Sequence, residues 1–341
     1  MSENLIYVYL SGIHKTLPKA EVMAIAEAEN IDIRVVLDAD QLLIVYSSSD
    51  LIEFLKLRSA YSRRIGRVLW VGRLEDIEDG ISRAIEILRS QGIESIKMEF
   101  KSLRGLEKER DYWNVVKLLS GSGMRLSRTS SKTLDIILFH EIAVVGLRDY
   151  ELRLKDLFDR WSNRRPAYLP GALNPDISRI FVNLSRASIR QNTIFYDPFC
   201  GVGSFLLEAC YMGLNYAGSD IDERSVEGAL KNLRSYGCTP EVFLADVCRM
   251  PIHKVDAIGT DMPYGRQTKP LGVSIIELIK CMLENSESVL KKGSYLVFAQ
   301  ISELEEHVYR YVSKLDFELV EVHRNWVHGS LTRNIYVLRK K

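Results

Sequence analysis

The sequence predicts an α/β protein with a Rossmann-like C-terminal domain, whose sheet is mostly parallel with an antiparallel last strand, preceded by α+β domains. From about residue 190, apolar β-rich runs alternate with helical segments, which is the pattern of a parallel sheet covered by helices. The first 150 residues instead group strands between pairs of helices, as α+β folds do. The length of 341 residues exceeds one comfortable core, and 46% hydrophobic residues suffice for two or three domains.

The N-terminal elements are placed by their periodicity. Residues 1–58 have the order of a ferredoxin-like domain, with strands expected at 5–10, 33–37 and 42–46 and helices at 18–29 and 51–57. Residues 59–150 form a second α+β domain, with helices expected at 76–90 and 110–119 and strands at 95–100, 133–139 and 141–145. Residues 151–174 are charged, contain Pro166 and are expected to be a linker.

The C-terminal domain is expected to span residues 175–341. It should begin with a helix around 175–190 and continue with strands at 192–196, 215–220, 242–246 and 255–260 and a helix at 204–212. Near its end, strands at 317–326 and 334–339 are joined by a short connection. We expect this hairpin to put an antiparallel strand at the end of the sheet.

Composition excludes several classes of protein. The N-terminus lacks a basic segment followed by a long apolar one, and no apolar run approaches about 18 residues, so we expect a cytoplasmic protein without membrane contact. The five cysteines are odd in number and show no C-x-x-C spacing, and the six histidines are scattered. We therefore expect neither a disulfide framework nor a metal site.

Residues 197–204, Asp-Pro-Phe-Cys-Gly-Val-Gly-Ser, lie between an expected strand and an expected helix. Gly201 and Gly203 allow a tight turn, and small residues there let a ligand approach the backbone N–H groups at the helix start. A dinucleotide loop would have a third glycine where this chain has Leu206, which argues against NAD. The loop, including Cys200, predicts a nucleoside-like ligand.

Carboxylates end three successive expected strands. Asp197 is placed to accept from an ammonium group, as S-adenosylmethionine offers. Asp220 stands where doubly wound folds bind ribose hydroxyls, with Asp222 as the less favoured alternative, and Asp246 suits an adenine amino group. Each of these residues taken singly is equally well explained as a helix N-cap. Their order after one glycine loop favours a methyl-donor site.

The next expected strand ends in Asp261-Met262-Pro263-Tyr264. An exocyclic base amine is a poor nucleophile because its lone pair is conjugated into the ring. The Asp261 carboxylate and the Met262 carbonyl could accept its two hydrogens, while Pro263 stiffens the turn and Tyr264 offers a face for stacking an extracted base. The alternative interpretation is a strand followed by a Pro-Gly turn.

These motifs resemble those of the Rossmann-type, S-adenosylmethionine-dependent amino-methyltransferases, whose tetrapeptide is Asp/Asn-Pro-Pro-Tyr/Phe, with Met262 as a departure. Together with the segment 165–175, they resemble the THUMP-domain tRNA guanine-N2 methyltransferases, especially the archaeal-type enzymes acting at guanosine 10. The resemblance implies that residues 59–150 are a THUMP RNA-binding domain and that tRNA is methylated once or twice on guanosine N2. Some relatives require a small activating protein subunit, and the sequence does not predict the oligomeric state.

The net charge of +1 does not by itself mark a nucleic-acid-binding protein. Residues 101–165 hold 14 Lys and Arg against 9 Asp and Glu, an excess that a solvated face explains equally well. The candidate RNA contacts are Arg104, Arg125, Arg128, Arg164, Arg165 and Arg333. Two alternatives remain open at this point: methylation of another base amine, adenine N6 or cytosine N4, and an inactive RNA-binding adaptor in which Met262 marks the loss of activity.

Overall fold

The computed structural model describes residues 3–103, 108–153, 155–264, 274–329 and 331–341. The chain divides into two compact units. The first consists of residues 1–15, 31–56 and 62–152, and the second of residues 16–30, 57–61 and 153–341. These units differ from the predicted segments, because two short N-terminal pieces pack with the C-terminal part of the chain.

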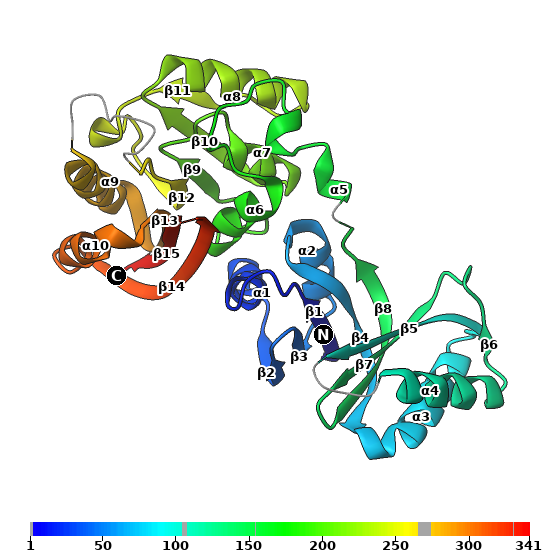
Figure 1. The fold of residues 1–341 in the computed structure, drawn as a ribbon. Helices are drawn as coiled ribbons and strands as arrows, with labels where there is room; N and C mark the ends of the chain where they lie inside the picture. Colours follow the sequence, from blue (N-terminus) through cyan, green and yellow to red (C-terminus); the bar gives the residue numbers. More distant parts are fainter. Residues whose placement is uncertain (1–2, 104–107, 154, 265–273, 330) are drawn as a thin grey trace. The chain divides into compact units, whose positions relative to one another are not determined.

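One mixed sheet of eight strands forms the first unit (Figure 1). The strands are β1 (Asn4–Leu10), β2 (Ile33–Ala39), β3 (Leu42–Ser47), β4 (Ser62–Arg73), β5 (Ser95–Leu103), β6 (Arg125–Leu126), β7 (Thr133–Phe139) and β8 (Ile142–Glu151). Their order is β2-β3-β1-β4-β8-β7-β5-β6. The strands expected within the first 150 residues are confirmed, and β4, which was not predicted from the sequence, joins them into one sheet.

Strand β4 was not predicted because its first half, Ser-Arg-Arg-Ile-Gly-Arg, is rich in charged residues and lacks an apolar strand pattern. In the structure these arginines are paired within the first unit. Arg64 donates to Asp135 at 2.9 Å and to Glu99 at 2.7 Å, and Arg67 donates twice to Asp149. The partners of these arginines therefore lie on three other strands of the same sheet, β5, β7 and β8.

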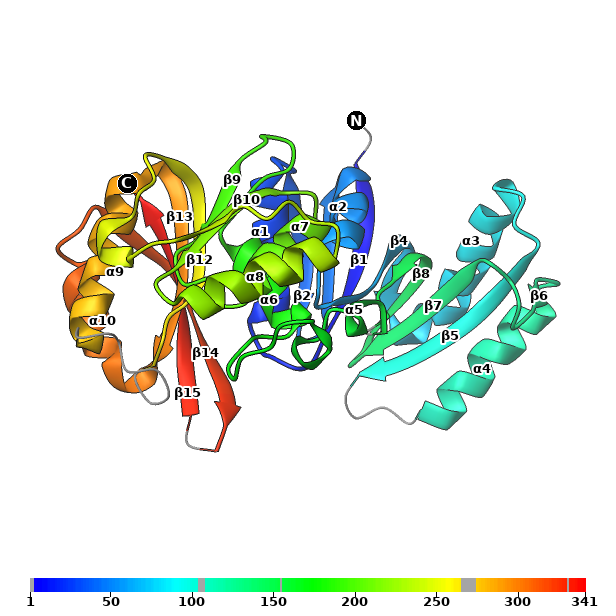
Figure 2. The ribbon, with the colours of Figure 1, turned by 90° about the horizontal axis from the view of Figure 1, so that it is seen from above.

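Two helices pack on the sheet of the first unit, α3 (Ile77–Ser90) and α4 (Lys108–Gly121), and Figure 2 shows them beside β5 and β7. Ile81, Leu88 and Leu119 from these helices share a buried cluster with Leu134 and Val145 of the strands. The short helix η1 (Leu74–Asp76) precedes α3. Helix α2 (Asp50–Arg58) begins in the first unit, and its last two residues belong to the second.

A seven-stranded sheet forms the framework of the second unit. Its strands are β9 (Ile194–Asp197), β10 (Asn215–Asp220), β11 (Val242–Leu244), β12 (Val255–Asp261), β13 (Leu290–Ile301), β14 (Phe317–His328) and β15 (Leu331–Lys340), in the order β11-β10-β9-β12-β13-β15-β14. All pairs up to β13 are parallel, and β15 is antiparallel to both its neighbours. The antiparallel last strand is confirmed, but it lies inside the sheet and not at its end, where β14 stands.

Helices cover both faces of this sheet. They are α1 (Leu17–Ala28), α5 (Lys155–Phe158), η2 (Ser162–Arg164), α6 (Pro175–Leu184), α7 (Ser204–Tyr211), α8 (Glu223–Ser235), η3 (Val247–Arg249), α9 (Ile275–Val289), η4 (Ser302–Leu304) and α10 (Glu305–Val312). Phe195 packs in one buried cluster with residues of α6, α7 and α8, whereas the next residue, Tyr196, packs in another with residues of α9 and α10. Successive strand residues thus face opposite helix layers, which confirms the doubly wound architecture.

A buried polar network joins the N-terminal pieces to this unit. Glu21 of α1 accepts from Ser59 Oγ at 2.7 Å, from the backbone N–H groups of Ala60 and Tyr61, and from Asn183 Nδ2 at 2.9 Å. Burial raises the pKa of Glu21, while these donors oppose the rise. Asn183 lies on α6, which ends at Leu184 and not at the expected residue 190, because Arg186 has φ +56°.

Four of the five cysteines are joined in disulfides, Cys210–Cys238 and Cys248–Cys281. The expectation that no disulfides form is therefore wrong. The partners are 28 and 33 residues apart in sequence and meet only because α7 lies beside the end of α8 and η3 beside α9. Cysteine spacing carries no sign of such pairs.

In the part of the chain that the structure describes, no helix has the length and apolar character needed to cross a membrane.

Candidate active site

The carboxyl ends of three neighbouring strands bring the predicted acids together. Asp197, Asp220 and Asp261 are the last residues of β9, β10 and β12. These strands are adjacent and parallel in the order β10-β9-β12, so their ends share one edge of the sheet. In open α/β folds this edge is where ligands bind.

The glycine loop before α7 has the backbone conformation that its sequence predicts. Gly201 and Gly203 have φ +51° and +83°, the left-handed region that glycine tolerates. A Cβ atom at Gly201 would meet open space, whereas one at Gly203 would lie 3.3 Å from Ala229 Cβ. Gly201 therefore leaves its backbone accessible, and Gly203 permits close packing against α8.

Cys200 contributes its backbone to the loop, donating N–H to Ser219 O at 2.9 Å. Its thiol is buried, and burial raises its pKa well above the ordinary value. A protonated, enclosed thiol is a packing group and a poor nucleophile. The predicted place of Cys200 in the donor loop stays a prediction that rests on its backbone.

Asp220 organises the loop. One of its oxygens accepts from Gly201 N–H at 2.9 Å and the other from Asp222 N–H at 3.0 Å. Asp222 itself accepts from Ser225 N–H at 3.1 Å as the N-cap of α8, so the alternative ribose contact is a helix cap. Asp246 is half-buried and also acts as a cap, since it accepts from Cys248 N–H at 2.9 Å at the start of η3.

Asp197 is the deepest of the acids. It is fully enclosed and accepts from Thr260 Oγ1 at 2.7 Å and from Phe199 N–H at 3.1 Å. Burial raises the pKa of Asp197 to about 8, with smaller contributions from the charges of Asp220 and Asp261. Thr260, which the sequence does not mark as a candidate, is the side chain that donates to this acid. A cation bound beside Asp197 would offset the cost of burying its charge and favour the carboxylate form.

Asp261 is held by two side chains. Its Oδ2 accepts from Arg333 Nη1 at 2.9 Å, and its Oδ1 accepts from the Tyr264 hydroxyl. Burial and the Asp261 charge raise the pKa of Tyr264, so its phenol stays protonated and donates. Arg333 was a candidate for contact with RNA or with the pocket rim, and its side chain is 4% exposed and lies in the candidate active site.

Met262 points away from the ligand edge. Its side chain is 1% exposed and belongs to the buried cluster that contains Ile279 and Met282 of α9. Pro263 follows half-buried. The departure from the usual tetrapeptide is therefore accommodated in the core, and the backbone carbonyl of Met262 is the part of the residue left for a ligand.

The other proposed RNA contacts fall into three groups: exposed, outside the described residues, and buried. Arg125, Arg128 and Arg164 are exposed, and Arg164 lies 3.8 Å from Asp159. Arg104 lies outside the described residues. Arg165 is 5% exposed and donates to Ser204 Oγ at 2.6 Å, Arg160 O at 2.8 Å and Leu173 O at 2.9 Å.

Arg165 is therefore a buried structural residue, contrary to the prediction that it contacts RNA.

A second set of buried hydrogen bonds lies nearby and is made by a residue of α8. Asn232 is fully buried and donates Nδ2 to Ala167 O at 3.0 Å and to Val202 O at 2.8 Å, while its Oδ1 accepts from Ala167 N–H at 2.8 Å. These contacts fix the segment 165–175 against the glycine loop. A lone Asn in a helix gave no sequence signal for this contact.

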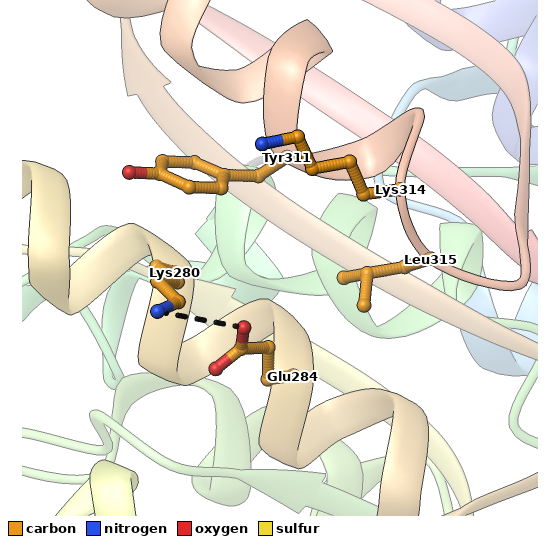
Figure 3. Close-up of a pocket in the computed structure, with 5 residues that line it drawn as sticks. All are labelled: Lys280, Glu284, Tyr311, Lys314 and Leu315. Carbon is orange, nitrogen blue, oxygen red and sulfur yellow. Dashed lines mark ion pairs between the residues drawn. The ribbon is translucent and has the colours of Figure 1, made fainter.

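A separate cavity of about 330 Å³ lies between α9 and α10 (Figure 3). It is lined by Lys280, Glu284, Tyr311, Lys314 and Leu315. Lys280 and Glu284 form an ion pair at 3.9 Å across one turn of α9. None of the predicted catalytic or donor-binding residues is among the lining residues, so the cavity is distinct from the carboxylate edge.

This chain is similar to known methyltransferases in sequence and to solved structures in fold. Residues 162–335 match the family described as RMKL-like, methyltransferase domain. Solved structures of similar fold include TrmN from Thermus thermophilus, with a TM-score of 0.56 and 18% identity over 99% of this chain and 100% of that chain. The SMU.472 protein, solved in complex with SAH, has a TM-score of 0.55 and 15% identity over 100% of this chain and 99% of that chain.

Two curated relatives align over nearly the whole chain. The tRNA (guanine(10)-N2)-dimethyltransferase of Methanothermobacter thermautotrophicus is 30% identical over 343 residues, covering 98% of both chains. That of Pyrococcus abyssi is 30% identical over 352 residues, covering 99% of this chain and 100% of the relative. The chain therefore belongs to the methyltransferase family that contains the tRNA (guanine(10)-N2)-dimethyltransferases of these organisms.

Proposed function

We propose that this enzyme transfers methyl groups from S-adenosylmethionine to the N2 amine of a guanosine in tRNA, at guanosine 10, adding one or two. The observation that carries the proposal is the position of Asp261. It ends β12, which lies beside β9, and β10 follows on the other side of β9; the terminal acids of β9 and β10 flank the glycine loop. A hydrogen-bond acceptor for an amine and a candidate donor pocket thus share one edge of the sheet.

The acids of the site fit a cationic donor. Asp197 and Asp220 both have raised pKa values, first because of burial and further because of neighbouring carboxylates. A sulfonium and an ammonium group would offset this repulsion, whereas the pyrophosphate of NAD would add two negative charges to it. Gly201 offers the open backbone against which the donor would lie, with Asp220 for ribose and Asp246 for adenine.

When bound, S-adenosylmethionine would supply an electrophilic methyl group on sulfur. Asp261 Oδ1 accepts one amine hydrogen and the Met262 carbonyl the other, which favours a pyramidal nitrogen with an available lone pair. Asp261 can then hold the proton that N2 releases as its bond to the methyl carbon forms. Tyr264 supports the base by stacking. Most of the rate enhancement would come from this positioning.

The substrate assignment is supported by the relatives, whose names specify guanine N2 at position 10 of tRNA. The Asp261 carboxylate and the Met262 carbonyl could equally accept hydrogens from adenine N6 or cytosine N4, so these two acceptors alone do not select guanine. We assign RNA binding to residues 59–150 as a THUMP domain, with exposed Arg125 and Arg128 as candidate phosphate contacts, and add exposed Arg164 of the segment 151–174 as a further candidate.

Titration calorimetry with S-adenosylmethionine, followed by transfer of labelled methyl groups to unmodified tRNA, tests this proposal. We expect donor binding and incorporation of label into tRNA but not into duplex DNA. Absence of donor binding would favour the inactive adaptor, and label in DNA would favour a DNA base-amine methyltransferase.

A further inference from the structure

Arg333 reaches the site from a strand that is distant from Asp261 in sequence. Within the sheet, Asp261 of β12 lies opposite Ala299 of β13, and Ile301 of β13 lies opposite Arg333 of β15. Because β15 runs against the parallel strands, its first residues lie at the edge where those strands end. The topology therefore places an arginine at the catalytic edge.

Arg333, Asp261 and Tyr264 form a closed set of hydrogen bonds. Arg333 Nη1 donates to Asp261 Oδ2 at 2.9 Å and to the Tyr264 hydroxyl at 2.9 Å. The Tyr264 hydroxyl donates in turn to Asp261 Oδ1. Both carboxylate oxygens are thus engaged, one by a cation and the other by a neutral hydroxyl.

The guanidinium is enclosed. Arg333 is 4% exposed, and its Cζ lies 5.7 Å from the centroid of the Phe181 ring. Burial alone would lower the pKa of Arg333, but the Asp261 carboxylate and the Tyr264 oxygen outweigh it and raise the pKa above its ordinary value. Its Nε is buried and has no hydrogen-bond partner among the described residues. A purely structural arginine would gain from satisfying that donor as well.

We propose that Arg333 is a positioning residue of the transfer reaction, holding Asp261 by Oδ2 while Oδ1 exchanges the Tyr264 hydroxyl for the substrate amine. The inference rests on the proposed function of Asp261 as amine acceptor. Both bonds end on the charged carboxylate, but only the guanidinium brings an opposite charge to it, so the amine displaces the neutral hydroxyl and not the guanidinium. Arg333 thereby fixes the carboxylate plane and leaves one defined oxygen for the substrate.

The test compares Arg333→Gln and Arg333→Lys with Arg339→Gln. Arg339 lies on the same strand but is exposed, so its variant removes the same charge away from the site. For Arg333→Gln we expect kcat to fall about 100-fold, with KM for tRNA and Kd for S-adenosylmethionine within about threefold of wild type.

Arg333→Lys keeps the charge but lacks the planar guanidinium that contacts Asp261 Oδ2 and the Tyr264 hydroxyl, so kcat should fall only about tenfold. Arg339→Gln should behave as wild type. Unchanged kcat in either Arg333 variant, or a rise in KM for tRNA alone, would overturn the proposal.

If Arg333→Gln fails to fold, as judged by circular dichroism, the kcat of Arg333→Lys tests the proposal alone: a fall of about tenfold supports it, and an unchanged kcat overturns it. The product made by the wild-type enzyme reports separately on the proposed function. Methylation of a nucleoside other than guanosine would refute the proposed function. The kcat values of the Arg333 variants would then be measured on the nucleoside that is methylated, so the role of Arg333 is tested independently.

Discussion

Asp261 and Asp197 end adjacent strands, but their surroundings give them different roles. Asp261 is half-buried and contacts groups that a ligand can displace, whereas Asp197 is enclosed by Thr260 and backbone. We expect Asp261→Ala to lower kcat at least 100-fold, because no side-chain oxygen remains for the amine. Donor affinity should be unchanged. Asp261→Asn should lose less, since its amide oxygen still accepts one hydrogen, and full activity in Asp261→Ala would contradict the assignment.

Asp197 predicts a pH dependence. Its pKa of about 8 lies above the unfolded value of about 3.9, so the protonated acid stabilises the donor-free protein at low pH, and this contribution is lost as pH rises from about 4 to 8. A cationic donor needs the carboxylate form. Donor Kd should therefore fall by up to about tenfold per pH unit between pH 6 and 8, with release of a proton.

Calorimetry in buffers of different ionisation enthalpy measures both effects of Asp197. The Asp197→Asn variant is the matched control, because it keeps the size and loses the titration. Its donor affinity should be weaker and should vary little between pH 6 and 7.5. A wild-type Kd that is constant over this range would show that Asp197 does not charge on donor binding.

At the residue scale, site residues that lie in a local strand-and-loop motif could be predicted from the sequence. Residues whose contacts are distant in the sequence could not. The acids Asp197, Asp220 and Asp261 follow apolar strands directly, and the fold brings them to one edge. Arg333 was a candidate for RNA or the pocket rim because it lies in the connection between the last two expected strands, and its contact with Asp261, 72 residues away, carried no local signal. Asn232 carried no signal because its partners lie 65 and 30 residues away.

At the element scale, the two disulfides tie helices on either side of the site. Cys210 lies near the end of α7 and Cys238 follows α8, while Cys248 in η3 is joined to Cys281 in α9. Each link restricts the unfolded chain over about thirty residues. Replacing Cys210 and Cys238 by Ser together should lower the free energy of unfolding by about 3 kcal/mol.

Denaturant unfolding of wild type and of the double variant measures this difference. It should disappear in reducing buffer, where the wild type loses the same link. A difference that persists under reduction would mean that packing of the sulfur atoms, and not the covalent bond, carries the effect.

The elements themselves were largely predictable where periodicity was undisturbed. Strands such as β3 and β7 are largely apolar, whereas the arginines of β4 made it resemble a polar segment. Two acidic partners of these arginines, Asp135 and Asp149, come more than seventy residues later. Local sequence cannot reveal such pairing.

At the scale of the whole molecule, tRNA binding should depend on exposed cations. Arg125 and Arg128 are exposed, and replacing both by Ala should raise KM for tRNA and leave kcat unchanged. The slope of log KM against log salt should decrease by about 0.7 to 0.9 for each phosphate that the variant no longer neutralises. Arg73→Ala is the control, since this exposed arginine is paired with Glu75 and Asp76. An equal effect in the control would assign the change to net charge.

Mapping of the modified nucleoside tests the central claim most directly. Unmodified tRNA is incubated with the enzyme and S-adenosylmethionine, digested, and analysed by mass spectrometry. We predict N2-methylguanosine or N2,N2-dimethylguanosine at position 10 and no product with Asp261→Ala. Methylation of adenine N6 or cytosine N4, or full product from Asp261→Ala, would contradict it.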